Sequence, residues 1–241
     1  MKMLSGIYSP DGGKIYFENV PTYFSSPLVA REKGISTVYQ ELKLCPNLNV
    51  VENVFLGREY HKGIGLDWKR MEQVAQKKLD ELGIGIDVHM HVGSLSTAQM
   101  QLVEIAKAML IFSKVLILDE PTSSLTMNET DKLFSIIEQL KRDGMTILFI
   151  SHRMEEIFRI SDRISVMRNG EYLGTYQKDN ISPEKIVALI SHKELDESTN
   201  IYAGREKISF SENDPVALEV SHLNRGKQVQ DISFKLHEGE I

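Results

Sequence analysis

The stretch Val115-Leu116-Ile117-Leu118-Asp119-Glu120-Pro121 decides the fold class of this chain. Four apolar residues in succession, bounded by polar positions, predict a short strand that is buried on both faces. Similar strands are predicted over 146–150 and over 35–39, with helical patterns between the three. Helices that alternate with short apolar strands are typical of a parallel sheet with helices on its faces. The sequence therefore predicts an α/β fold.

Helical spacing of apolar residues surrounds these strands. It predicts helices over 28–33, 68–82 with Asp67 as N-cap, about 98–110, and 129–142. Residues 1–6 are interpreted as the tail of a helix that ends at Gly6. These segments supply the helical layers of the predicted fold.

The pattern changes after Asp162. Asn169-Gly170 between two strand patterns predicts a hairpin over 164–176, and Ser182 is expected to cap a helix that runs through Ile190. Residues 192–215 are polar and without sustained periodicity, and strand patterns resume at 216–220 and 232–236. We expect a domain over 1–191, a linker over 192–215 and the start of a second domain over 216–241.

Composition restricts the function classes. The 241 residues include 28 Lys and Arg against 34 Asp and Glu, a net charge of −6, which argues against a dedicated nucleic-acid binder. The single cysteine, Cys45, cannot form an internal disulfide and fits a reducing compartment. No apolar run approaches the roughly 18 residues that span a bilayer. We expect a cytosolic protein with no nucleic-acid partner.

Asp119 and Glu120 place two carboxylates at the tip of the predicted central strand. Ligands of open α/β sheets bind outside the carboxyl ends of the strands. One carboxylate there can hold Mg²⁺ while the other polarises a water molecule. A strand that simply ends in a polar loop is the alternative, and the two acids alone do not decide between them.

Other polar residues stand at comparable positions. Ser96 and Gln99 fit an S-x-x-Q capping box, and such a helix start can also receive an anion. His152 follows the 146–150 strand, where it can contact a terminal phosphate or serve only the structure. Gln40 follows the 35–39 strand, where it can orient a water molecule, touch a metal or be an ordinary loop residue.

The order of these residues resembles the ATP-binding-cassette family. Gln40 looks like its glutamine loop and Leu95-Ser96-Thr97-Ala98-Gln99 like its signature motif. Asp119-Glu120 looks like the end of its Walker B strand, Ser124-Leu125-Thr126 like its D-loop, and His152 like its switch histidine. Three longer stretches are similar to the tandem ATPase subunits of bacterial ribose and galactose/methylgalactoside importers: Glu104-Ile105-Ala106-Lys107-Ala108, Asp119-Glu120-Pro121-Thr122-Ser123-Ser124-Leu125-Thr126 and Ser151-His152-Arg153-Met154-Glu155-Glu156-Ile157-Phe158.

The resemblance implies a RecA-like P-loop ATPase core with a helical subdomain at about 68–109. It implies ATP and Mg²⁺ as cofactors, and a peripheral location on the cytoplasmic face of the cell membrane. The implied partners are membrane permease subunits, a periplasmic sugar-binding protein and a second cassette in cis or in trans.

The resemblance also assigns roles to single residues. It implies that Glu120 polarises the attacking water, that His152 contacts the γ-phosphate, and that Asp119 and Gln40 serve the metal. The residues implied to contact nucleotide are Gln40, Ser96, Thr97, Ala98 and Gln99.

The sequence departs from the family pattern in three places. Thr97 and Ala98 stand where glycines are usual, and Thr126 replaces the D-loop aspartate, where it can cap the next helix together with Glu129. No G-x-x-x-x-G-K-[ST] occurs anywhere, although that loop supplies the backbone cradle for phosphate.

The resemblance of residues 1–6 and 231–241 to segments that flank this loop implies a cassette that is incomplete at its N-terminus, followed by the opening strands of a second one. We therefore expect little ATP hydrolysis by the isolated chain. Two other functions stay open: a non-catalytic module that binds a permease or partner cassette, and a metal-dependent phosphoesterase that uses Asp119, Glu120 and His152.

Overall fold

The computed structural model describes residues 1–110, 113–191, 215–225 and 229–237. The chain divides into two compact units, Met1–Ile186 and Val187–Ile241, and each is described by itself. The predicted linker at 192–215 lies almost entirely outside the described residues. The domain ranges inferred from the sequence therefore stay predictions.

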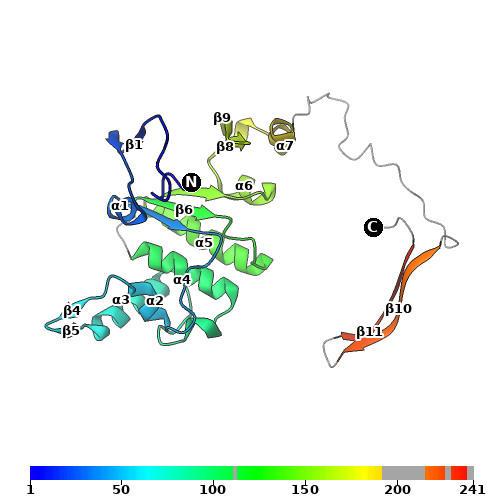
Figure 1. Cartoon of the computed structure of the whole chain (residues 1–241), viewed down its shortest axis with the longest axis horizontal. Coiled ribbons are helices and arrows are strands. Elements are labelled where there is room, and N and C mark those ends of the chain that lie inside the picture. The colour runs from blue at the N-terminus through cyan, green and yellow to red at the C-terminus, as the bar shows by residue number, and fades with distance from the viewer. Residues whose placement is uncertain (111–112, 192–214, 226–228, 238–241) are drawn as a thin grey trace. The chain divides into compact units, whose positions relative to one another are not determined.

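A three-stranded parallel sheet forms the centre of the first unit (Figure 1). Its order is β3 (Ile35–Val38), β6 (Val115–Asp119) and β7 (Thr146–Ile150). Both strand pairs are in parallel register, with Leu118 opposite Val38 on one side and Phe149 on the other. The predicted α/β class and its three strands are confirmed, although β3 ends one residue earlier than the sequence suggested.

Alternation along the strands sends side chains into two separate cores. Leu116 and Leu118 of β6 join Val38 of β3 in the larger core. Ile117 points to the opposite face and packs with Ile35 in a smaller core. Burial on both faces explains why the central strand is a continuous apolar run rather than an alternating one.

Helices cover the face of the sheet that belongs to the larger core. The helices α2 (Val50–Phe55), α3 (Trp68–Glu81) and α4 (Thr97–Met109) contact one another, and α5 (Met127–Arg142) packs on β7 (Figure 1). The aromatic rings of Phe134 and Phe149 meet edge to face there, with centroids 5.9 Å apart. The last three of these helices match the predicted ranges, whereas α2 was not predicted.

Smaller elements complete the first unit. Asn169-Gly170 forms the turn of an antiparallel hairpin, as predicted, with Arg168 opposite Glu171. The remaining elements are β1 (Ile15–Phe17), β2 (Val20–Thr22), α1 (Pro27–Glu32), β4 (His61–Lys62), β5 (Gly65–Leu66), η1 (Val92–Ser94), α6 (Met154–Ile160), β8 (Arg163–Arg168), β9 (Glu171–Gln177), η2 (Lys178–Asn180) and the first part of α7 (Pro183–Ser191).

The N-terminal segment differs from the helix tail that the sequence suggested. Residues 1–6 form a hydrogen-bonded turn rather than an α-helix. The N–H of Ile7 donates to the carbonyl of Lys2 at 2.9 Å and that of Gly6 to Met3 at 3.2 Å, the bond pair of a Schellman motif. Gly6 has φ +71°, and a Cβ there would lie 2.4 Å from the carbonyl oxygen of Ser26, so the predicted glycine stop is present without a full helix before it.

The second unit contains a long antiparallel hairpin. Its strands are β10 (Val216–Arg225) and β11 (Val229–His237), with Glu219 opposite Lys235 and Val220 opposite Phe234. Both strands extend beyond the predicted segments at 216–220 and 232–236.

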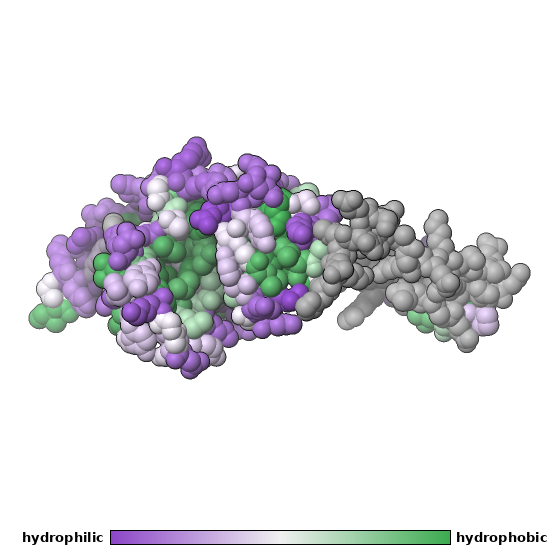
Figure 2. Space-filling view, turned by 90° about the horizontal axis from the view of Figure 1, so that it is seen from above, coloured by the Kyte–Doolittle hydropathy of each residue, from purple (hydrophilic) through white to green (hydrophobic). Residues whose placement is uncertain are grey.

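The surface of the first unit is mixed in character. Figure 2 shows apolar residues in green near its middle and polar residues in purple along its borders. On β7, Ile147 and Phe149 pack against the larger core, whereas Leu148 on the other face is 38% exposed. Within the part of the chain that the structure describes, no helix combines the length and apolar character needed to cross a membrane.

Candidate active site

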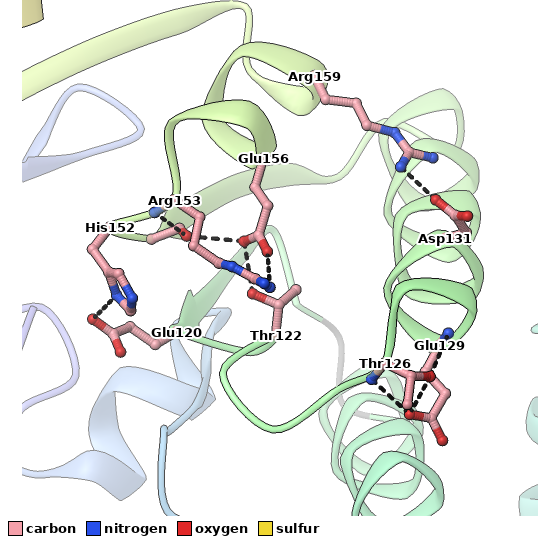
Figure 3. A network of polar contacts seen from close by, with 10 residues as sticks. Glu120, Thr122, Thr126, Glu129, Asp131, His152, Arg153, Glu156 and Arg159 are labelled. Atoms are coloured by element: carbon pink, nitrogen blue, oxygen red, sulfur yellow. Dashed lines mark hydrogen bonds and ion pairs between the residues drawn. The ribbon is translucent and has the colours of Figure 1, made fainter. Parts of the chain in front are cut away.

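The carboxyl ends of the three parallel strands bring together Gln40, Glu120 and His152. The Nε2 of Gln40 donates to Oε2 of Glu120 at 3.4 Å. The Nδ1 of His152 lies 3.1 Å from the other carboxylate oxygen, a contact that Figure 3 shows. Glu120 is therefore contacted from both neighbouring strand ends. The side chain of Glu120 is 27% exposed and that of His152 is 70% exposed, so the cluster is open to solvent.

Strand register explains why residues so far apart in sequence meet. Because Leu118 lies opposite both Val38 and Phe149, the residues that follow these three positions leave the sheet at the same edge. Gln40 and Glu120 each stand two residues beyond the register row, and His152 stands three beyond it. The expectation that Gln40, Glu120 and His152 share one edge of the sheet follows from the topology alone.

The backbone at Glu120 is unusual. Its φ is +47°, in the left-handed region that a residue with a Cβ seldom adopts. Its N–H still donates to the carbonyl of Ile150 at 3.0 Å, so the sheet pairing continues through the turn. Such backbone strain costs on the order of 1–3 kcal/mol and occurs preferentially at functional sites.

Asp119 occupies the last position of β6, opposite Ile150. Alternation directs it to the face opposite that of Leu118. Among the described residues, no hydrogen bond or ion pair joins its carboxylate to Gln40, its expected companion at the metal. The structure thus gathers three of the four strand-end candidates into one contact cluster and places Asp119 directly before it.

The signature-like segment forms a second, separate region at the start of α4. The Oγ of Ser96 accepts from the N–H of Gln99 at 3.2 Å, and Oε1 of Gln99 accepts from the N–H of Ser96 at 2.9 Å. The predicted capping box is therefore confirmed. Thr97 begins the helix and Ala98 is buried. In the described part of the chain, no hydrogen bond links these four residues to the cluster around Glu120.

A buried network behind the strand ends was not predicted from the sequence. Glu156 of α6 is only 6% exposed and accepts hydrogen bonds from the hydroxyls of Thr122 at 2.6 Å and Ser151 at 2.9 Å (Figure 3). The guanidinium of Arg153 pairs with its second oxygen at 2.7 Å. One sequence signal existed: Glu156 and the buried Ile160 are four residues apart and so share the inward face of α6.

The start of α5 carries another local cap. Oε2 of Glu129 accepts from the N–H of Thr126 at 2.9 Å and from its hydroxyl at 2.8 Å. These bonds, the backbone one first, lower the pKa of the Glu129 carboxyl below its ordinary value. Thr126 therefore caps a helix where the family pattern has an aspartate, as expected from the sequence.

A cavity of about 240 Å³ lies beside this site rather than in it. Its lining includes Tyr39, Arg31 and Arg58 but neither Glu120 nor His152. Burial, and then the charge of Arg31, lower the pKa of the Arg58 guanidinium. This cavity is therefore separate from the contact between Glu120 and His152.

The donor set fits part of a magnesium–nucleotide site. Carboxylate and amide oxygens are ligands that Mg²⁺ accepts, and Mg²⁺ is commonly held by one or two protein oxygens together with phosphates and water. The described residues contain no group of three or more His, Cys, Asp or Glu side chains that would hold a metal unaided. Asp119 and Gln40 can therefore supply protein ligands only if phosphate and water complete the shell.

A parallel sheet with these motifs at its carboxyl edge and at the start of α4 defines an ATP-binding cassette. The model of the ABC transporter family matches residues 1–123, and the chain belongs to that family. The solved structures that resemble it include a nucleotide-free ATP-binding cassette from an ABC transporter. That structure has a TM-score of 0.68 and 26% identity, over 78% of this chain and 80% of the other. A cassette solved in its ADP conformation has a TM-score of 0.65 and 26% identity, over 85% and 82%. The predicted fold class is confirmed.

Curated relatives are more specific. The chain is 41% identical over its whole length to the Ribose import ATP-binding protein RbsA 2 of Burkholderia pseudomallei. It is 42% identical over its whole length to the Galactose/methyl galactoside import ATP-binding protein MglA of Salmonella typhimurium. It spans about half the length of these relatives, 47% of each.

Proposed function

We propose that this chain is part of an ATP-binding and ATP-hydrolysing subunit that powers the import of a monosaccharide. The observation that carries the proposal is the contact of Glu120 with both Gln40 and His152 at the edge of the parallel sheet. The curated relatives, which are named as ribose and galactose/methyl galactoside import proteins, support the class of transported sugar.

Each strand-end residue has a role in this proposal. Glu120, oriented from two sides, polarises the attacking water. His152, whose side chain is 70% exposed, reaches the terminal phosphate, while Asp119 and Gln40 provide protein oxygens for Mg²⁺. Hydrolysis of this kind depends on positioning and charge stabilisation, which rigid strand ends supply.

The start of α4 has a different role. The free side of the Ser96 hydroxyl and the first turn of the helix can face an anion, because a helix start presents unpaired N–H groups and a positive dipole end. We propose that Ser96, Thr97, Ala98 and Gln99 contact ATP held by a second cassette, in cis or in trans. This role does not require them to touch the Glu120 cluster of their own chain.

The location and partners follow from the same proposal. The subunit would lie on the cytoplasmic face of the cell membrane, against permease subunits that receive sugar from a periplasmic binding protein. In this proposal residues 1–191 belong to the first cassette, 192–215 to a linker and 216–241 to the start of a second cassette. No nucleic-acid partner is part of it.

The experiment that tests this function compares two chains. One is the 241-residue chain alone, and the other is the same chain preceded by a strand and a G-x-x-x-x-G-K-[ST] loop from a relative. We expect background ATP turnover from the first, because its sequence contains no such loop. The second chain should hydrolyse Mg-ATP. In that chain, Glu120→Gln should lower the rate of hydrolysis at least about a hundredfold.

Other outcomes would favour the alternatives. Robust turnover by the 241-residue chain alone, lost on Glu120→Gln, would contradict the need for the loop. Hydrolysis of model phosphate esters with added metal, lost on Asp119→Asn or His152→Ala, would indicate a phosphoesterase. Binding to a permease without either activity would indicate a non-catalytic module.

A further inference from the structure

The buried carboxylate of Glu156 connects two loops that carry the candidate active site. Its partner Thr122 stands two residues after Glu120, and its partner Ser151 stands directly before His152. The same oxygen, Oε2, accepts from both hydroxyls (Figure 3). A single atom of α6 therefore joins the turn after β6 to the turn after β7.

The other contacts of this network fix its orientation. Ser151 donates its hydroxyl proton to Glu156 and accepts the backbone N–H of Arg153 at 3.0 Å, so its oxygen is held from both sides. The guanidinium of Arg153 pairs with Oε1 of Glu156 at 2.7 Å. Both oxygens of the Glu156 side chain thus have hydrogen-bond partners, as a buried polar group requires.

We propose that Glu156 is a positioning residue that sets Glu120 and His152 against each other. It touches neither side chain. It fixes the loop on which each is mounted, and its hydrogen bonds to the two hydroxyls are of the strong, charge-assisted type. The meaning of this role for catalysis rests on the proposed ATPase function, whereas the positioning itself is a property of the chain without nucleotide.

The start of α5 provides a matched control. Glu129 also accepts a threonine hydroxyl, that of Thr126, but this pair is exposed and only three residues apart in sequence. Glu129→Gln removes the same charge from a comparable contact on a helix start. It should weaken α5 locally without disturbing the strand ends.

The experiment uses the 241-residue chain with the variants Glu156→Gln and Glu129→Gln. Amide hydrogen exchange is measured at Arg153, and the ring signals of His152 are followed by NMR at fixed pH. The variant Glu120→Ala, which has no side-chain partner for the imidazole, marks how far those signals move when the contact is lost. In Glu156→Gln, Ser151, which accepts the Arg153 N–H, loses its hydrogen bond to the carboxylate. We expect protection of the Arg153 amide to fall about ten- to hundredfold, from the strength of a hydrogen bond to a charged group. The His152 signals should move toward those of Glu120→Ala. In Glu129→Gln only the first turn of α5 should lose protection.

A second pair of variants keeps the test valid if Glu156→Gln fails to fold. Thr122→Val and Ser151→Ala each remove one hydroxyl from the carboxylate, and each should move the His152 signals in the same direction by less. If the His152 signals and the Arg153 amide stay unchanged in all these variants while overall stability falls, Glu156 is a structural residue and the proposal is wrong.

The positioning role and the ATPase proposal fail separately. If the His152 signals do not move in Glu156→Gln, Thr122→Val or Ser151→Ala, the positioning role is wrong, whatever the enzyme assays show. Conversely, if the loop-supplied chain shows no ATP turnover but the shift is present, the positioning stands and the proposed reaction is wrong.

Discussion

The edge of the parallel sheet and the start of α4 both present polar side chains, but they are built in opposite ways. Gln40 and His152 reach Glu120 from positions 80 and 32 residues away. At the start of α4, the side chains of Ser96 and Gln99 each accept the backbone N–H of the other, and the two residues are only three positions apart. The first region exists only when three strands are in register, whereas the second is complete within one helical turn. A change in the core should therefore damage the sheet edge most, and a change in the cap should stay local.

The largest expected effect comes from the core beneath the sheet edge. Leu118 is fully buried in β6, one row before the acidic pair, and Leu118→Ala leaves a cavity between sheet and helices. We expect the free energy of unfolding to fall by about 2–5 kcal/mol, measured by urea denaturation.

A matched control for Leu118→Ala is Ile64→Ala, because Ile64 is fully exposed between β4 and β5. That change should stay within about 0.5 kcal/mol. Equal losses in the two variants would mean that the sheet does not form the core on which the Glu120 cluster depends.

Local signals in the sequence predicted local structure well. Three elements form for reasons that lie within a few residues of sequence: the strand at Val115–Leu118, the helix cap at Ser96 and the turn at Asn169-Gly170. The strand-end cluster was also predictable, because parallel strands end at one edge. The contacts of Glu120 with Gln40 and His152 could not be predicted, because they depend on the register between the strands, which the sequence pattern does not determine.

Features that depend on distant packing were missed. Glu156 looks like an ordinary acid in the first turn of a helix, and only the folded chain brings Thr122 and Ser151 to it. The six residues of α2 are too few to show a helical period, so its burial was not expected. At the N-terminus, Gly6 adopts the left-handed conformation of a helix stop, but the predicted helix tail is wrong, because residues 1–6 form a turn and no α-helix.

An intermediate effect is expected at the start of α4. Ser96→Ala removes the hydroxyl that accepts from the N–H of Gln99 and should lower stability by about 1 kcal/mol. The control is Ser96→Asn, which keeps an accepting oxygen at the N-cap and should retain most of the stability that Ser96→Ala loses. Hydrogen exchange should increase in the first turn of α4 while the ring signals of His152 stay in place. A shift of His152 in Ser96→Ala would show that the two regions are coupled within one chain.

The smallest effect distinguishes two caps of the same design by their response to acid. The cap of α4 uses Gln99, which does not titrate, whereas the cap of α5 uses Glu129, whose pKa is lowered by the N–H and hydroxyl of Thr126. Because the folded pKa lies below the unfolded one, the stabilisation is present above the unfolded pKa and is lost as the pH falls through the folded pKa. Amide exchange in the first turn of α5 should therefore rise on acidification within that window, and the first turn of α4 should not follow it. Glu129→Gln should remove this pH dependence. If amide exchange rose at the starts of both α4 and α5, or if Glu129→Gln kept the pH dependence, the loss of protection would come from general acid unfolding and not from the cap.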